Sequence, residues 1–319
     1  MVPRVLNVGR LPQPLIDRLQ ADFRLETLAA QPDPRGYLDT HGRGIEAMVT
    51  SAAVGVDAAL IDALPDLRVI CSFGVGLDRI DVEAAHRRGI EVGYTPDVLN
   101  DCVADHAMAL LLDVARQVSR ADRYVRRGHW PQGLAFPLGR KVSGARLGIV
   151  GLGRIGRTIA RRAEGFEMEV RYHSRRSVPD ARWAHEPDLL ELARWADFLV
   201  VITSGGPATR HLIDGEVLDA LGPKGCLVNV ARGSVIDEEA LVLALEQGRI
   251  GGAGLDVYTD EPHVPARLFE LDNVVLTPHI ASATEQTRQA MADLVLENLR
   301  SFFTTGRVVA PVPKAVITA

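Results

Sequence analysis

The sequence predicts an α/β protein with two doubly wound, parallel-sheet domains. Short apolar runs typical of buried strands alternate with segments of helical periodicity along most of the chain, and this alternation is typical of parallel βαβ units. One such unit, at residues 146–176, has a glycine turn between a strand and a helix. The 319 residues are enough to form two sizeable hydrophobic cores.

The first hundred residues predict a doubly wound unit of their own, without a full dinucleotide fingerprint. Strands are expected at residues 4–9, 23–28, 46–50, 67–71 and 90–92, and helices around residues 15–19, 58–64 and 80–85. The fourth strand runs into Gly74-Val75-Gly76. Two interpretations of this turn stay open: a tight strand-to-helix connection, or a cradle whose backbone N–H groups converge on a carboxylate.

A long helix is expected at about residues 98–119, after Thr95-Pro96-Asp97 interrupts the pattern. An arginine-rich stretch follows, and then two segments with apolar side chains but no periodic face, residues 128–131 and 136–139. We interpret these segments as an arm that packs on something else, such as a second subunit.

The segment at residues 146–176 has the pattern of a dinucleotide-binding unit. The apolar run Leu147–Val150 is followed by Gly151-Leu152-Gly153-Arg154-Ile155-Gly156, an amphipathic helix and a second strand at residues 168–172. Its three glycines would provide a tight turn, close approach to a pyrophosphate and close helix–strand packing. The unpaired N–H groups and positive dipole end of the helix would face the phosphates. A glycine-rich turn without a ligand is the alternative, but strand and helix flank this one on the correct sides.

The end of the second strand favours NADPH over NADH. NAD-binding units usually place Asp or Glu there for the ribose 2′-OH, whereas this chain has Tyr172-His173-Ser174-Arg175-Arg176 and no carboxylate before Asp180. Arginine forks suit a 2′-phosphate, and Ser174 can donate a hydrogen bond as well. The alternative is that Arg175 and Arg176 are solvated loop charges.

The remaining predicted strands end in segments that can carry chemistry. Strands are expected at residues 196–201, 226–230, 253–257 and 274–276, and helices at residues 215–220, 238–246 (with Asp237 as N-cap) and 284–303. Ligands of open parallel sheets bind at the carboxyl ends of the strands. The segments there are the glycine turn, residues 174–176, the loop 204–209, Arg232, Glu261 and His279.

Arg232, Glu261 and His279 form a candidate reaction centre. Taken singly, they could be a surface charge, a solvated loop carboxylate and a core histidine. Together they match the reduction of a 2-keto acid, in which an imidazolium donates a proton to the keto oxygen. A neighbouring carboxylate favours the charged imidazole, and an arginine binds the substrate carboxylate and polarises the carbonyl.

The composition excludes several other classes of protein. An apolar fraction of 47% with 24% charged residues is ordinary for a soluble globular protein, and the net charge of −5 argues against nucleic-acid binding. No apolar run approaches the roughly 18 residues of a membrane span, and the amino terminus is unlike a signal peptide. Cys71, Cys102 and Cys226 lie far apart in apolar runs, so we expect reduced core thiols, no metal site and a cytoplasmic location.

Four motifs, in this order along the chain, resemble those of the D-isomer-specific 2-hydroxyacid dehydrogenases. They are GLGRIG at residues 151–156, NVARG at 229–233, DVY at 256–258 with Glu261-Pro262, and TPHI at 277–280. The resemblance covers essentially the whole chain. It implies a Rossmann cofactor domain (99–287), a discontinuous flavodoxin-like substrate domain (1–98 and 288–319), and a homodimer whose cleft closes by hinge motion.

The resemblance also implies roles for individual residues. Arg232 would bind the substrate, Glu261 would be the partner of His279, and His279 would be the acid/base. The substrate carboxylate would meet the backbone amides of Val75 and Gly76, with Ser282 as a further contact. The implied cofactor contacts are Gly151, Leu152, Gly153, Arg154, Ile155, Gly156, Ser174, Arg175, Arg176, Thr203, Thr209, Val230, Ala231 and Asp256.

Within the family, residues 72–78 and 172–176 look like the glyoxylate/hydroxypyruvate reductase branch, which prefers NADPH. The expected activity is therefore NADPH-dependent reduction of these small 2-keto acids to D-2-hydroxy acids, with NADH possible. The loop Ser204-Gly205-Gly206 departs from the Pro-Leu-Thr type common in the family, which leaves the contacts there open. Formate dehydrogenases have glutamine where Glu261 stands, and the long phosphoglycerate dehydrogenases carry an extra regulatory domain.

Two alternatives to that activity stay open. One is a reductase of bulkier 2-keto acids, of the phenylpyruvate or 2-ketogluconate type. The other is a nucleotide-sensing interaction protein, because transcriptional corepressors resemble this family.

Overall fold

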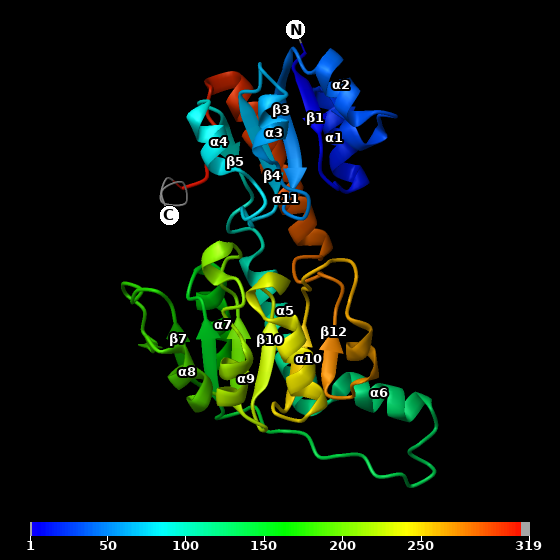
Figure 1. Ribbon diagram of the computed structural model, residues 1–319, viewed down its shortest axis with the longest axis vertical. Helices are drawn as coiled ribbons and strands as arrows, with labels where there is room; N and C mark the ends of the chain where they lie inside the picture. The colour runs from blue at the N-terminus through cyan, green and yellow to red at the C-terminus, as the bar shows by residue number, and fades with distance from the viewer. Residues whose placement is uncertain (1, 314–319) are drawn as a thin grey trace. The chain divides into compact units, whose positions relative to one another are not determined.

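The computed structural model describes residues 2–313, which form two compact units (Figure 1). Unit 1 consists of the described residues up to Leu99 and from Thr284 onward, and unit 2 is Asn100–Ala283. Each unit is built on its own sheet, and all strand pairs in both sheets are parallel. The predicted fold class, two doubly wound parallel-sheet domains, is confirmed.

The sheet of unit 1 has the strand order β2-β1-β3-β4-β5, which is the flavodoxin-like order. Its strands are β1 (Arg4–Asn7), β2 (Arg24–Thr27), β3 (Ile45–Ser51), β4 (Val69–Phe73) and β5 (Glu91–Gly93), and its helices are α1 (Gln13–Asp22), α2 (Pro34–His41), α3 (Ala58–Asp62), α4 (Val82–Arg87) and α11 (Glu285–Thr305). Asp33, Asp57 and Asp81 begin three of these helices, because each carboxylate accepts a hydrogen bond from a first-turn amide.

Buried Asn298 ties the C-terminal helix α11 into unit 1. Its Nδ2 donates to the Tyr94 carbonyl at 3.2 Å and its Oδ1 accepts from the Ala310 amide at 2.9 Å. These bonds satisfy a buried amide that would otherwise be costly. They also explain how the last described residues join a sheet made from the first hundred.

The sheet of unit 2 has the order β12-β11-β10-β9-β6-β7-β8. Counted from β6 as the first strand, this is the Rossmann order 3-2-1-4-5-6 with a seventh strand added. The strands are β6 (Arg146–Val150), β7 (Glu169–His173), β8 (Ala184–His185), β9 (Phe198–Val201), β10 (Cys226–Asn229), β11 (Gly252–Leu255) and β12 (Val274–Leu276), and the helices are α5 (Asn100–Arg116), α6 (Val118–Arg126), α7 (Arg154–Glu164), α8 (Leu189–Trp195), α9 (Gly215–Leu221) and α10 (Glu238–Glu246).

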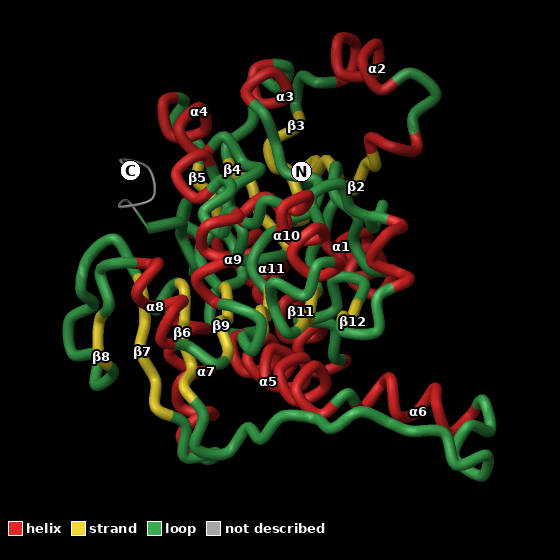
Figure 2. The backbone as a smooth tube through the Cα atoms, turned by 60° about the horizontal axis from the view of Figure 1, so that its bottom comes forward, coloured by secondary structure: helices red, strands yellow, loops and turns green. Residues whose placement is uncertain are grey.

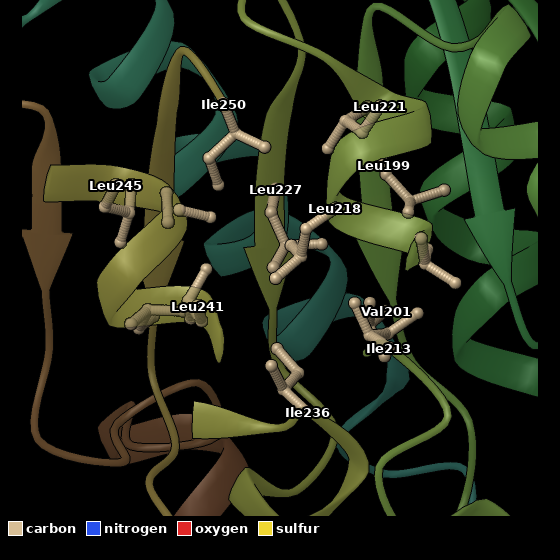
Figure 3. Packing of buried hydrophobic residues seen from close by; sticks show 14 of the residues in the cluster. Leu199, Val201, Ile213, Leu218, Leu221, Leu227, Ile236, Leu241, Leu245 and Ile250 are labelled. Carbon is tan, nitrogen blue, oxygen red and sulfur yellow. The ribbon is translucent and has the colours of Figure 1, made fainter. Parts of the chain in front are cut away.

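Helices cover both faces of the unit 2 sheet, with α5 and α7 on one face and α8, α9 and α10 on the other (Figure 1). Buried aliphatic side chains of the strands and of α9 and α10 interdigitate between the layers; Leu199, Leu218, Leu227 and Leu241 are examples (Figure 3). Full burial of one such side chain stabilises a fold by about 1.5–3 kcal/mol. This core holds the strand ends, and therefore the candidate site, in fixed positions.

Two glycines let α5 lie unusually close to β11. A Cβ on Gly254 would lie 3.0 Å from the Leu110 Cβ, and a Cβ on Gly252 would lie 2.9 Å from the Val114 Cγ2. Leu110 and Val114 are one helical turn apart, so they face the strand together. The residue one turn before them on the same face is His106, which thereby comes to the carboxyl end of β11.

Three features differ from the sequence predictions. The helix expected at residues 98–119 is two helices, because Gln117 adopts a left-handed conformation (φ 55°) between α5 and α6. The segment from α6 to the start of β6, where the sequence predicted an arm, extends past the sheet of unit 2 (Figure 2). Helices α2 and α8 and strand β8 were not predicted from the apolar pattern. Cys71 and Cys226 are buried, but Cys102, expected as a core thiol, is only half-buried on α5.

Among the described residues, none of the helices has both the length and the apolar character that crossing a membrane requires.

Candidate active site

The glycine turn after β6 has the three separate properties that a dinucleotide fingerprint needs. Gly151 has φ +103°, and a Cβ there would lie 2.9 Å from the Thr203 backbone nitrogen. A Cβ on Gly156 would lie 2.2 Å from the Gly151 carbonyl oxygen, so this glycine allows α7 to approach the turn. A Cβ on Gly153 would meet no described atom within 4 Å. The open space therefore lies at the N-terminus of α7, where backbone N–H groups favour an anion.

The flanking residues of the turn differ in exposure. Leu152 and Gly156 are buried, Ile155 is half-buried, and Gly153 and Arg154 are exposed. The turn lies where the strand order reverses, between β7 and β9 on the two sides of β6. Ligands of doubly wound sheets bind at this switch point.

The loop after β7 is braced by hydrogen bonds to its own backbone. The Tyr172 hydroxyl accepts from the Val178 amide at 2.9 Å, and the Ser174 hydroxyl donates to the Arg176 carbonyl at 2.6 Å. His185, on β8, lies with its Nε2 3.0 Å from the Ser174 carbonyl oxygen. Arg175 and Arg176 are exposed at the tip. The loop thus presents two guanidinium groups, while the Ser174 hydroxyl is used to hold its shape.

Arg232 follows β10 in a turn that buried Asn229 organises. The Asn229 Oδ1 accepts from the Ala231 amide at 3.0 Å, and its Nδ2 donates to the Arg232 carbonyl at 3.0 Å. A Cβ on Gly233 would lie 1.9 Å from the Tyr258 carbonyl carbon, so only glycine allows these backbones to meet. The turn therefore brings Arg232 beside the segment that carries Glu261.

His279 and Glu261 are in direct contact: the His279 Nδ1 lies 2.7 Å from the Glu261 Oε2. The Glu261 Oε1 accepts from the Tyr258 amide at 3.1 Å. Burial alone would raise the pKa of Glu261, but the bond and charge of His279, the Tyr258 amide and the charge of Arg232 together lower it. An ionised Glu261 only accepts, so the His279 Nδ1 carries a proton and Nε2 is the atom that can exchange one with a ligand.

Asp256 is fully buried at the end of β11 and holds the segment that carries His279. Its Oδ1 accepts from the Thr277 hydroxyl at 2.7 Å and the Ile280 amide at 2.8 Å, and its Oδ2 accepts from the Ala281 amide at 2.9 Å. The His279 amide donates to the Asp256 carbonyl at 2.9 Å. His279 has φ +53°, a conformation that costs a non-glycine residue about 1–2 kcal/mol.

His106 completes this group and was not predicted from the sequence. Its Nε2 lies 3.0 Å from the Thr277 Oγ1 and 3.3 Å from the Asp256 Oδ1. Burial would raise the pKa of Asp256, but the hydrogen bonds from His106, Thr277 and the two amides lower it. The sequence gives no signal for His106, because it lies within a predicted helix and 171 positions separate it from Thr277.

The other predicted contact residues are distributed over both units. In unit 2, Thr203 contacts Gly151, the Thr209 hydroxyl donates to the Ser204 carbonyl at 2.7 Å, Val230 and Ala231 are buried, and Ser282 is half-buried. In unit 1, Val75 and Gly76 are half-buried after β4, and the Val75 side chain packs on the core of that unit. No cluster of three metal-binding side chains occurs in residues 2–313.

Comparison with known proteins assigns this arrangement to a family. The family model for the D-isomer specific 2-hydroxyacid dehydrogenase NAD binding domain matches residues 108–281. The chain belongs to the D-isomer specific 2-hydroxyacid dehydrogenase family. It is an oxidoreductase of that family, and the matched residues lie within unit 2.

Members of the family with named activities are similar over nearly the whole chain. The glyoxylate/hydroxypyruvate reductase A of Arabidopsis thaliana and the hydroxyphenylpyruvate reductase of Plectranthus scutellarioides are each 47% identical over 298 residues, 93% of this chain and 95% of each relative. An NADPH-dependent glyoxylate/hydroxypyruvate reductase of Sinorhizobium meliloti, solved in complex with NADP and malonate, is 41% identical with a TM-score of 0.90, covering 98% of both chains.

Proposed function

We propose that this chain reduces small 2-keto acids, such as glyoxylate and hydroxypyruvate, to D-2-hydroxy acids with NADPH. The observation that carries the proposal is the hydrogen-bonded pair of His279 and Glu261, whose atoms Nδ1 and Oε2 lie 2.7 Å apart. The positive charge of Arg232 acts on Glu261, and the glycine turn of the same unit leaves space for an anion. The similar proteins with this activity support it. Unit 2 is then the dinucleotide-binding domain and unit 1 the substrate domain.

Two residues of unit 2, His279 and Glu261, carry out proton transfer in this proposal. When bound, NADPH supplies the hydride that adds to the keto carbon. His279, as an imidazolium bonded through Nδ1 to Glu261, donates the Nε2 proton to the keto oxygen, so the product is the neutral hydroxyl and His279 ends neutral. Glu261 accepts a hydrogen bond from the His279 Nδ1 and so holds the orientation of the ring.

Arg232 and unit 1 bind the substrate in this proposal. Arg232 donates to the substrate carboxylate and polarises the carbonyl, where charged donors stabilise the developing negative charge. The backbone amides of Val75 and Gly76 donate to the same carboxylate, and Ser282 is a further contact. The side-chain preference follows from residues near Val54, Phe73 and Leu77.

The cofactor fits the residues present. The space above Gly153 and the N-terminus of α7 suit a pyrophosphate. Arg175 and Arg176 suit a 2′-phosphate, and an end of β7 without a carboxylate suits NADPH better than NADH. NADH remains usable, since the pyrophosphate site is common to both. Arg154, Thr203, Thr209, Val230, Ala231 and Asp256 are the further proposed contacts.

A homodimer and a cytoplasmic location belong to the same proposal. Large apolar side chains are exposed along residues 118–138; Trp130 is 71% exposed and Leu138 is 96% exposed. A second copy of the chain would remove this apolar surface from water. None of the three cysteines, all of which lie within the described residues, forms a disulfide, which suits a reducing compartment.

A keto-acid panel tests the proposal. Oxidation of NADPH and of NADH would be followed at fixed enzyme concentration with glyoxylate, hydroxypyruvate, 4-hydroxyphenylpyruvate and 2-ketogluconate. We expect the highest kcat/KM for the two small acids with NADPH. A higher value for the bulky acids would favour the alternative substrate class, to which the hydroxyphenylpyruvate reductase belongs. Cofactor binding without turnover of any acid would favour a nucleotide-sensing role.

A further inference from the structure

We propose that His106 is a positioning residue for the reaction: it acts through Thr277 and Asp256 to fix the segment 277–281, which carries His279. The inference rests on the proposed role of His279 in proton transfer. His106 itself lies on α5, away from that segment in sequence, and its Nε2 reaches both Thr277 Oγ1 (3.0 Å) and Asp256 Oδ1 (3.3 Å).

The directions of the hydrogen bonds are fixed by chemistry. Asp256 is a carboxylate with a lowered pKa, so it only accepts. The Thr277 hydroxyl must therefore donate its single proton to Asp256, at 2.7 Å. Its oxygen is then left as the acceptor for His106, whose Nε2 must carry a proton. The three groups form one directed chain that ends on Asp256, which His106 reaches through Thr277 and also directly, at 3.3 Å.

The end of this chain holds His279 in its unusual conformation. The Asp256 carboxylate also accepts from the amides of Ile280 and Ala281, which follow His279 directly. His279 has φ +53°, so its backbone stays there only while the bonds on both sides persist. Loss of the His106 donor would remove its contacts with Thr277 and Asp256, the two side chains that anchor this segment.

The position of His106 is set by packing and not by the network alone. Gly252 and Gly254 let α5 approach β11 at its Val114 and Leu110 contacts, and His106 continues that row by one turn. The side chain is 18% exposed and that of Asp256 is 1% exposed, so water competes little for either group. Helix α5 therefore places the His106 donor beside the buried carboxylate of Asp256.

Three variants and a matched control test the proposal. His106→Leu removes the donor, and His106→Gln restores an N–H close to the position of Nε2. Thr277→Val removes the relay hydroxyl at similar volume. His86→Leu makes the same replacement on the exposed face of α4 in unit 1. The measurements are kcat and KM for glyoxylate, NADPH affinity by fluorescence, and the solvent deuterium isotope effect on kcat.

We expect His106→Leu to lower kcat roughly 10- to 100-fold, as slight misplacement of a reacting group does. NADPH affinity should change less than about threefold, since a displaced proton donor affects the chemical step more than binding. The solvent isotope effect should rise because proton donation becomes more rate-limiting. His106→Gln should regain most of the loss, and His86→Leu should leave kcat unchanged.

Equal kcat in His106→Leu and the parent, or a glutamine variant no better than the leucine one, would overturn the proposal. If His106→Leu does not fold, Thr277→Val decides, because it should show the same selective fall in kcat. The activity of His279→Ala distinguishes failure of the proposed function from failure of the positioning role of His106. Full activity in that variant would contradict the proposed function itself. Loss of activity in His279→Ala together with unchanged activity in His106→Leu would contradict only the positioning role.

Discussion

Each unit carries a glycine turn directly after one of its strands, yet the two turns lead into different elements. In unit 2, Gly151–Gly156 leads at once into α7, a helix of 11 residues whose N-terminus adjoins the open space at Gly153. In unit 1, Gly74–Gly76 follows β4, and the next helix begins only at Val82 and has six residues. A helix dipole can therefore support a phosphate in unit 2, whereas unit 1 offers backbone amides alone.

The strand ends of the two units differ in the same way. Those of unit 2 bear ionisable side chains: Arg232, Asp256, Glu261 and His279. The turn after β4 in unit 1 bears none between Phe73 and Leu77. The candidate reaction centre thus lies in unit 2, and the glycine turn of unit 1 is uncharged. We therefore expect the two glycine turns to suit different ligands.

The largest expected effect is that of His279→Ala in unit 2. Removal of a general acid should lower kcat for glyoxylate about 10²- to 10⁴-fold, while NADPH still binds. Stopped-flow reduction rates and fluorescence titration would measure the two properties separately. Glu261→Gln keeps a hydrogen-bond partner without the charge, so its kcat should lie between those of His279→Ala and the parent. Undiminished turnover in His279→Ala would contradict the division of chemistry between the units.

Arg232→Ala should have the next largest effect. Loss of the charged donor should lower kcat roughly 10²-fold and also raise the KM for the keto acid, because both carbonyl polarisation and carboxylate binding depend on it. Arg232→Lys, which keeps the charge but not the fork, should recover part of the loss. A change confined to NADPH affinity would assign Arg232 to the cofactor.

Arg175→Asp should reverse or abolish the preference for NADPH. The loss of one charge-assisted hydrogen bond to the 2′-phosphate, and repulsion by the new carboxylate, should weaken NADPH binding about tenfold or more. NADH binding should change little. The ratio of kcat/KM for the two cofactors measures this, and a variant that keeps the parent ratio would show that the arginine is a solvated loop charge.

Gly74→Ala tests unit 1 and should have a smaller effect. Its Cβ would lie 2.6 Å from the Ala52 Cβ, so the turn before Val75 must shift. We expect a loss of stability near ~1 kcal/mol and a rise of a few-fold in the KM for glyoxylate. NADPH affinity should be unaffected. A change in NADPH affinity with an unchanged KM would break the proposed assignment of the two turns.

Acidification is expected to have the smallest effect of these tests. Folding stability should change little near neutral pH and should fall increasingly below about pH 4. The pKa values of Asp197, Asp256 and Glu261 in unit 2, and of Glu26 in unit 1, are all lowered. The unfolded chain therefore binds more protons, so this stability is present above the ordinary carboxyl range of about 4 and is lost as pH falls through the folded values.

Urea midpoints between pH 7 and pH 3 would measure this loss of stability. All three tryptophans, Trp130, Trp183 and Trp195, lie in unit 2, so their fluorescence reports that unit alone. A flat pH profile would contradict the pKa shifts.

Local sequence signals predicted much of the fold because they act over a few residues. The apolar runs predicted every strand of both sheets except β8 within a few positions. The prediction of Asp237 as an N-cap is confirmed by its bond to the Ala240 amide at 3.1 Å. Helix α8 was missed because its apolar pattern is short. The split at Gln117 was missed because a left-handed residue other than glycine leaves no compositional signal.

The sequence by itself determined the two parallel sheets, the glycine turn and the identities of Arg232, Glu261 and His279 as candidate groups, since periodicity and strand-end position are local properties. The tertiary structure alone decided that the His279 Nδ1 meets Glu261 at 2.7 Å, and that His106 reaches Asp256 and Thr277 from α5. Those contacts join residues 18 to 171 positions apart. They depend on how closely glycines let helix and strand approach, and that distance is a property of the packed core.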